Sequence, residues 1–231
     1  MTIPRSQRRP ARQKGVSTAQ ILLVVGAAVV AAALLIFLSS GRLRQAGGGT
    51  PAYPTGVTQD GHAYKGLPDA PLKLILYSDF LCGHCAEFAT VLDNLVPDYV
   101  ETGRLQVTYY NFAFLTPESV QAAKGSLCAL DQGAVAFWRY HDLLYANRDS
   151  GMVAYSKSRL KGYAGELGLD SVAFNRCFDT NAKAAQVQAD LDAGRQQGVE
   201  GTPTWFLNGQ REVGSKSESD LRQLFDDMLK K

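Results

Sequence analysis

The stretch Tyr77-Ser78-Asp79-Phe80-Leu81-Cys82-Gly83-His84-Cys85, YSDFLCGHC, holds two cysteines separated by only two residues. Residues 72–77, which lead into this stretch, form a short apolar run that predicts a buried central strand. After it, Phe88 and Leu92 belong to an apolar pattern with helical spacing. The cysteine pair is therefore expected at a strand-to-helix junction, and both the fold and the function depend on what the pair does there.

At such a junction Cys82 would lie at the N-terminus of the helix. Unpaired backbone N–H groups and the helix dipole favour an anion there, so the pKa of its thiol should fall. A stabilised thiolate favours the reduced form and makes the disulfide more oxidising. His84 would act in the same direction when protonated or donating a hydrogen bond. We expect Cys82 to be the attacking nucleophile, and the more buried Cys85 to resolve the mixed disulfide.

The cysteine pair has two other possible roles. A structural zinc site needs four ligands, usually as two closely spaced pairs, but Cys128 and Cys177 stand alone, and neither His62 nor His141 lies in a ligand cluster. Two inert buried thiols are the second alternative. A redox pair fits the position after a strand better than either, so the sequence calls for no metal and no cofactor.

The remaining pattern predicts an α/β protein. A second strand at 105–112 would follow the helix and form a parallel βαβ unit with the first. Helices are expected at 117–131, 133–147, 157–168, 171–178 and 182–197. A hairpin follows, with strands at 204–207 and 211–213 joined by Asn208-Gly209, and then a last amphipathic helix at 217–229.

These features together resemble the DsbA-like thiol:disulfide oxidoreductases of the thioredoxin-fold superfamily, in their membrane-anchored bacterial form. The resemblance covers about 60–231, and it rests on residues 68–71 (PDAP), 77–85, 141–145 (HDLLY) and 201–204 (GTPT). It implies a thioredoxin fold with an inserted helical domain at about 117–198. That insertion would cap the active-site face and widen a groove for unfolded chains.

The resemblance also assigns roles to Thr202 and Pro203. In the family this proline is cis and lies against the CxxC pair, and the backbone of Thr202 would pair with an extended substrate chain. By itself the motif could equally be an ordinary turn before a strand. One departure is Leu76, since many thioredoxin-fold enzymes carry a buried carboxylate at this position. The group that handles the proton of Cys85 is therefore left open.

The other two cysteines, Cys128 and Cys177, fall in the helical region, 49 residues apart. In an oxidising compartment an even cysteine count favours a structural disulfide between them. Two free buried thiols, or a second redox pair, are the alternatives.

The N-terminal part predicts a membrane anchor. Residues 21–38 carry no charge, five basic residues precede them and two follow closely, a pattern that favours a cytoplasmic N-terminus. We expect a basic head at 1–18, a transmembrane anchor at 19–40, a flexible linker at 41–56 and an extracytoplasmic domain at 57–231. A cleavable signal peptide is the alternative.

Residues 45–231 hold 17 basic and 22 acidic residues, and this net charge of −5 argues against nucleic-acid binding.

The expected function is therefore the introduction of disulfide bonds into reduced, unfolded secreted or surface proteins, by a monomer anchored in the cell membrane. By resemblance, a membrane reoxidase of the DsbB or vitamin-K-epoxide-reductase type would restore the Cys82–Cys85 disulfide. A reductase or isomerase that a membrane electron donor keeps reduced, and a chaperone or binding module whose cysteines are incidental, are the alternatives.

Overall fold

A computed structural model describes residues 52–230 of the chain. The predicted head, the predicted anchor and most of the predicted linker lie outside these residues. No helix in the described part is long and apolar enough to span a membrane. The folded domain begins earlier than the predicted boundary at 57, because Thr55 and Gly56 of strand β1 (Thr55–Val57) pair with Lys65 and Tyr64 of β2 (Ala63–Lys65).

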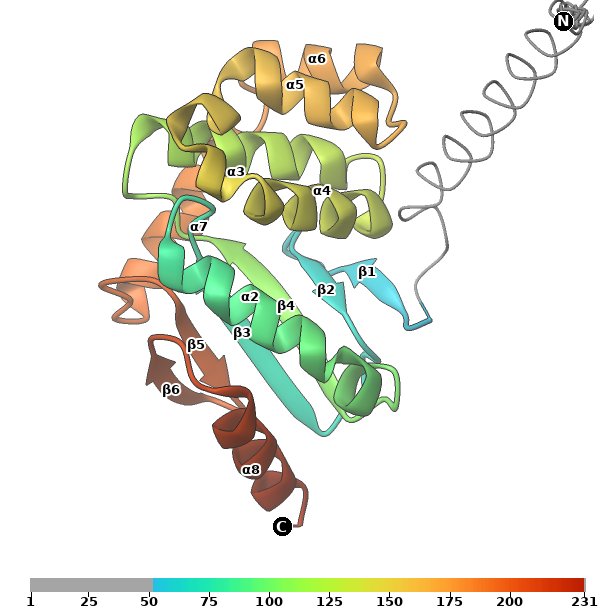
Figure 1. Cartoon of the computed structure of the whole chain (residues 1–231), viewed down its shortest axis with the longest axis vertical. Helices are drawn as coiled ribbons and strands as arrows, with labels where there is room; N and C mark the ends of the chain where they lie inside the picture. The colour runs from blue at the N-terminus through green and yellow to red at the C-terminus, as the bar shows by residue number, and fades with distance from the viewer. Residues whose placement is uncertain (1–51, 231) are drawn as a thin grey trace, which may run out of the picture. The chain divides into compact units, whose positions relative to one another are not determined.

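One six-stranded sheet in the order β1-β2-β4-β3-β5-β6 organises the domain (Figure 1). Its centre is the predicted βαβ unit, in which β3 (Leu72–Ser78) and β4 (Leu105–Asn111) run parallel and are joined through helix α2 (Gly83–Leu95). The α-helix ends at Leu95, and a π-helical turn, η1 (Val96–Val100), follows with Pro97 near its start. This agrees with the expected effect of a proline, which cannot donate the helical backbone hydrogen bond.

The late hairpin completes the sheet on the other side of β3. Strand β5 (Thr204–Leu207) pairs antiparallel with β3 and with β6 (Gln210–Val213). Asn208 and Gly209 between them both have positive φ, 48° and 85°. This is the conformation that a two-residue hairpin turn of this type requires, and Asn-Gly adopts it readily.

The two faces of the sheet are covered by different helices. On one face, side chains such as Leu74 and Leu76 join the main core with Phe88 of α2 and with Leu221 and Phe225 of α8 (Glu218–Leu229). The alternate side chains, among them Tyr77, face Leu191 of α7 (Ala184–Gln196) in a second, smaller cluster. Helix α7 approaches the sheet closely at Gly194, where a Cβ atom would lie 2.6 Å from the ring of Phe112.

The chain between β4 and β5 is the helical insertion that the sequence predicted. It comprises α3 (Pro117–Leu130), α4 (Ala134–Ala146), the short turns η2 (Arg148–Ser150) and η3 (Met152–Tyr155), α5 (Lys157–Glu166), α6 (Ser171–Asp179) and α7. Figure 1 shows α3 to α6 grouped together at one end of the sheet. The two short turns were not predicted, because segments of three or four residues carry too little periodic signal.

Candidate redox site

The turn between β3 and α2 is held by Asp79, a residue that is 1% exposed. Its carboxylate accepts hydrogen bonds from the backbone N–H groups of Leu81 (2.9 Å), Phe114 (3.1 Å) and Leu115 (3.2 Å). Its carbonyl oxygen accepts from the N–H of Cys82 at 3.0 Å. Asp79 thus ties the start of α2 to the segment after β4. Sequence reasoning gave it no role, since Phe114 and Leu115 lie more than thirty residues away.

Cys82 is the N-cap residue of α2, with extended backbone angles before the first helical turn. Its pKa is lowered from 9.0 to about 6, first by a hydrogen bond from the side chain of Cys85. Thr202 and the backbone N–H groups of Cys85 and His84 add to this lowering, while partial burial opposes it. The negative charge is therefore stabilised by donors at the helix start, as expected at this position.

Cys85 lies one helical turn further on and is 1% exposed, against 9% for Cys82. Burial raises the pKa of the Cys85 thiol far above its ordinary value, and the neighbouring Cys82 raises it further. Both residues are free thiols in this structure. The site thus holds one sulfur that is a thiolate at neutral pH beside one that keeps its proton.

The sheet brings Thr202 and Pro203 to these sulfurs from 120 residues away. Because Tyr77 near the end of β3 pairs with Thr204 at the start of β5, the residues before Thr204 lie next to the start of α2. The Thr202–Pro203 peptide bond is cis. When Cys82 is protonated, its thiol donates a hydrogen bond to the carbonyl oxygen of Thr202 at 3.2 Å.

The hydroxyl of Thr202 is buried and has no hydrogen-bond partner within residues 52–230. It nevertheless lies close enough to both sulfurs to lower the pKa of Cys82 and of Cys85. This hydroxyl is therefore available to donate to whichever sulfur carries the negative charge.

The ring of His84 points away from the sulfurs. Its Nδ1 atom lies 3.1 Å from a carboxylate oxygen of Glu87, and its side chain is 76% exposed. His84 contributes to the low pKa of Cys82 through its backbone N–H, not through its imidazole. The imidazole ring was expected to lower the pKa of Cys82, but the backbone N–H of His84 does so, and any residue with an N–H at this position would have the same effect.

Leu76, at the place of the family's carboxylate, is 3% exposed and belongs to the main core. Hydroxyl groups instead surround Cys85. The Ser78 hydroxyl lowers the pKa of the Cys85 thiol. Ser78 Oγ also lies 2.7 Å from the hydroxyl of Tyr145, which is 3.3 Å from that of Tyr109.

Phe80 and Leu81, the two residues before Cys82, lie in different environments. Phe80 is 1% exposed and packs on Tyr109, so it belongs to the core. Leu81 is half-buried and lines a surface cavity of about 260 Å³ with Arg148, Met152 and Tyr155. His141 is buried in helix α4, and its Nδ1 lies 2.8 Å from an Asp142 carboxylate oxygen.

Cys128 and Cys177 lie away from this site and are joined by a disulfide in the structure, with their Cα atoms 5.8 Å apart. Cys128 belongs to α3 and Cys177 to α6, so the bond links two helices of the insertion. Neither residue is at a helix N-terminus, where a thiolate would be stabilised.

Comparison with known proteins places this geometry in a family. The family model described as Thioredoxin matches residues 58–227. The chain is 25% identical over 170 residues to a probable disulfide bond formation protein D of Bacillus cereus, covering 72% of this chain and 78% of that protein. It is also 32% identical over 158 residues to the Na(+)/H(+) antiporter NhaA 3 of Salinispora tropica. That match covers 68% of this chain, but the chain spans only 23% of the antiporter.

Solved structures give the same fold. BdbD from Bacillus subtilis in its oxidised form has a TM-score of 0.69 at 20% identity, with 79% of this chain and all of that chain covered. The thiol-disulfide exchange protein alpha-DsbA2 from Wolbachia pipientis has a TM-score of 0.63 at 22% identity, with 71% of this chain and 86% of that chain covered.

Proposed function

Because the chain belongs to the thioredoxin family, we propose that it is a thiol:disulfide oxidoreductase that exchanges disulfides through Cys82 and Cys85. One observation carries this proposal. Of two thiols one helical turn apart, the more accessible Cys82 has a pKa of about 6, and burial holds the pKa of Cys85 far above neutrality. At neutral pH only one of the two sulfurs is a nucleophile, as a two-step exchange requires.

The reaction begins on the disulfide form of the site. A substrate thiolate attacks Cys82 Sγ, the Cys82–Cys85 bond breaks, and its electron pair goes to Cys85, which then takes up a proton. A second substrate thiolate attacks the mixed disulfide, forms the substrate disulfide, and releases Cys82 as a thiolate. The helix-terminal N–H groups and Thr202 stabilise that thiolate, so Cys82 is a good leaving group.

We propose the direction of a dithiol oxidase, which donates disulfides. Stabilising the Cys82 thiolate favours the reduced protein and so makes its disulfide a stronger oxidant. With a pKa lowered from 9.0 to about 6, this stabilisation is about 1.4 kcal/mol at pH 7, or ~30 mV for a two-electron couple. The similarity to disulfide bond formation proteins supports the same direction.

Substrate would bind across Cys82 and the Thr202–Pro203 turn. Thr202 N–H donates none of the hydrogen bonds found within residues 52–230, so an extended substrate chain could pair with this backbone. Exposed apolar side chains lie on segments that adjoin the site, namely Phe114, Leu115, Met152 and Val153. Such a surface suits reduced, unfolded secreted proteins, whose apolar residues are accessible.

The cellular setting completes the proposal. Residues 19–40 would anchor a monomer in the cell membrane, with the N-terminus cytoplasmic and the catalytic domain outside. A membrane reoxidase of the DsbB or vitamin-K-epoxide-reductase type would accept the electrons. We do not propose a transport function, because the match to this chain covers only 23% of the length of these two antiporter relatives.

The test is refolding of a reduced multi-disulfide protein by the oxidised full-length chain. Wild type should restore activity to the substrate, whereas Cys82→Ala and Cys85→Ala should not, because neither variant can form the Cys82–Cys85 disulfide that is donated. Activity that survives Cys82→Ala contradicts the mechanism. The reduction potential against glutathione then separates an oxidase from a reductase, and client protection that persists without either thiol would identify a chaperone.

A further inference from the structure

The proton of Cys85 poses a problem that the mechanism above leaves open. In each cycle Cys85 is released as a thiolate and protonated, and later loses its proton to re-form the disulfide. Cys85 is 1% exposed, and the position that carries a carboxylate in many thioredoxin-fold enzymes is Leu76. A thiolate of high pKa is a poor leaving group, so a proton donor near Cys85 would speed the exchange.

Three hydroxyl groups from three elements meet beside this sulfur. Ser78, the last residue of β3, lowers the pKa of the Cys85 thiol, and its Oγ is 2.7 Å from the hydroxyl of Tyr145 on α4. The hydroxyl of Tyr109 on β4 lies 3.3 Å from that of Tyr145. Tyr109 is 1% exposed, so of the two tyrosines it is Tyr145 that can connect Ser78 with the outside.

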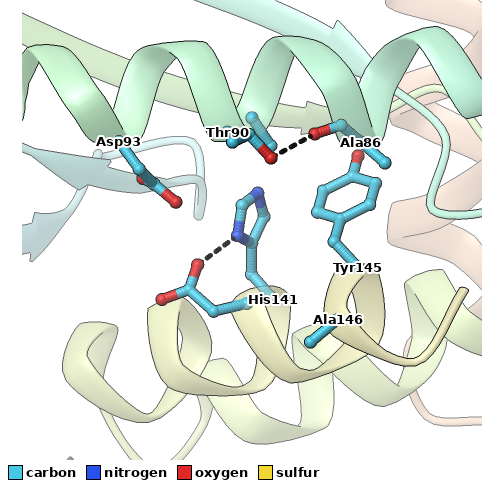
Figure 2. Close-up of a pocket in the computed structure, with 8 residues that line it drawn as sticks. Ala86, Thr90, Asp93, His141, Tyr145 and Ala146 are labelled. Atoms are coloured by element: carbon cyan, nitrogen blue, oxygen red, sulfur yellow. Dashed lines mark hydrogen bonds and ion pairs between the residues drawn. The ribbon is translucent and has the colours of Figure 1, made fainter.

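Tyr145 lines a cavity of about 190 Å³ between α2 and α4, with Ala86, Ala89, Thr90, Asp93, His141, Asp142 and Ala146. Figure 2 shows its ring rising from α4 toward Ala86 on α2, beside His141. The cavity opens to solvent, since the carboxylate side chains of Asp93 and Asp142 in its wall are 48% and 57% exposed. It is large enough for several water molecules and has polar groups to bind them.

We propose that Ser78 is a catalytic residue that passes the proton to and from Cys85, and that Tyr145 is a positioning residue that links Ser78 to solvent in this cavity. The inference rests on the proposed function, because it supplies the proton step of that exchange. No carboxylate is needed at position 76 if this chain of hydroxyls moves the proton.

The step balances in both directions. As the substrate sulfur bonds to Cys82, the Cys82–Cys85 electron pair moves to Cys85, which takes the Ser78 proton. Ser78 takes the Tyr145 proton, and Tyr145 takes one from water. On reoxidation, Cys85 returns its proton along the same path while its electron pair forms the bond to Cys82. The partner sulfur of the mixed disulfide then leaves with the electron pair of the broken bond.

Both tyrosines and the sulfurs are electrostatically coupled. Cys82 on the start of α2, Tyr109 on β4 and Tyr145 on α4 are the titratable groups around Cys85, and Asp79 acts on Tyr109 from the β3–α2 turn. Burial raises the pKa of Tyr145 well above its ordinary value. A free phenolate is thus unfavourable, and the protons must move together along the chain of hydroxyls.

The experiment measures how fast a small dithiol reduces the oxidised full-length chain, across neutral pH and in light and heavy water. We expect Ser78→Ala and Tyr145→Phe to slow this step roughly 10- to 100-fold, at or below the lower end of general acid–base effects. Both should lose the solvent isotope effect that wild type shows. Ser78→Thr, which keeps a hydroxyl, should recover much of the rate and the isotope effect.

Tyr140→Phe is the matched control. Tyr140 lies on the same helix, is fully buried, and donates its hydroxyl to the Leu160 carbonyl at 2.9 Å, a contact separate from the sulfurs. It should keep the wild-type rate and isotope effect. Wild-type rates, pH profile and isotope effect in both Ser78→Ala and Tyr145→Phe would overturn the relay. Failure of wild type itself to react with thiols would instead overturn the proposed function.

Discussion

Replacing Cys85 tests the feature on which the exchange chemistry depends, the low pKa of Cys82. The largest cause of that low pKa is the hydrogen bond from the Cys85 side chain, ahead of Thr202 and the backbone N–H groups. Cys85→Ala removes this donor, whereas Cys85→Ser retains a hydroxyl in the same place. The pair of variants therefore separates the hydrogen bond from the other effects of replacing a buried sulfur.

The magnitude follows from the energy of one hydrogen bond to a charged group, about 1.5–3 kcal/mol. Since one pKa unit corresponds to roughly 1.36 kcal/mol, losing the bond should raise the pKa of Cys82 by about one to two. The titration midpoint of the Cys82 thiol should thus move from about 6 in wild type to about 7–8 in Cys85→Ala. The remaining N–H donors at the helix start keep it below 9.0, the value for an ordinary thiol.

The assay is the ultraviolet absorbance of the thiolate as a function of pH in the reduced protein. Cys128 and Cys177 do not contribute while their disulfide is intact. Cys82→Ala is the control, and it should show no titration near neutrality, because burial raises the pKa of Cys85. The alkylation rate of Cys82 gives an independent measurement of the same midpoint.

Two results would refute this reasoning. If Cys85→Ala titrated at the wild-type midpoint, the hydrogen bond from Cys85 would not determine the pKa. If Cys85→Ser shifted as far upward as Cys85→Ala, the change would come from lost packing, since serine keeps the donor.

Three further predictions concern stability. Because the folded-state pKa of Cys82 is depressed from 9.0 to about 6, its thiolate stabilises the reduced protein above the unfolded-state pKa, and this stabilisation is lost as the pH falls toward 6. The difference in unfolding free energy between reduced wild type and reduced Cys82→Ala should therefore grow by about 2 kcal/mol from roughly pH 6 to pH 8, and a difference independent of pH would be inconsistent with a depressed pKa. Replacing both Cys128 and Cys177 by alanine should lower the free energy of unfolding in urea by about 4 kcal/mol on the chain-entropy account, given the 49-residue separation. A loss below ~1 kcal/mol would argue against that account. Asp79→Asn should cost roughly 1–3 kcal/mol, since the N–H groups of Leu81, Phe114 and Leu115 would share one acceptor oxygen fewer at this buried side chain. The exposed Asp69→Asn should stay within about 0.5 kcal/mol, and equal losses in the two variants would contradict the role given to Asp79.

Local sequence patterns were enough to predict the elements around the cysteine pair. An apolar run followed by helical spacing put Cys82 at a strand-to-helix junction, and the structure makes it the N-cap of α2. The parallel βαβ unit, the helical insertion and the Asn208-Gly209 hairpin were also predicted, because each depends on periodicity or turn chemistry within a short stretch. The greater burial of Cys85 followed from the helical spacing in the same way.

The family resemblance had placed Thr202 and Pro203 beside the sulfurs, but the contacts that distant groups make there depend on the tertiary structure. Thr202 reaches Cys82 from 120 residues away through the register of β5 on β3, and Tyr145 reaches Ser78 from 67 residues away through the packing of the insertion. The direction of the His84 ring, toward Glu87, was likewise not predictable from the sequence. The physical reason is that periodicity reports local backbone preference, whereas hydrogen bonds between distant groups depend on strand register, helix packing and side-chain rotamers.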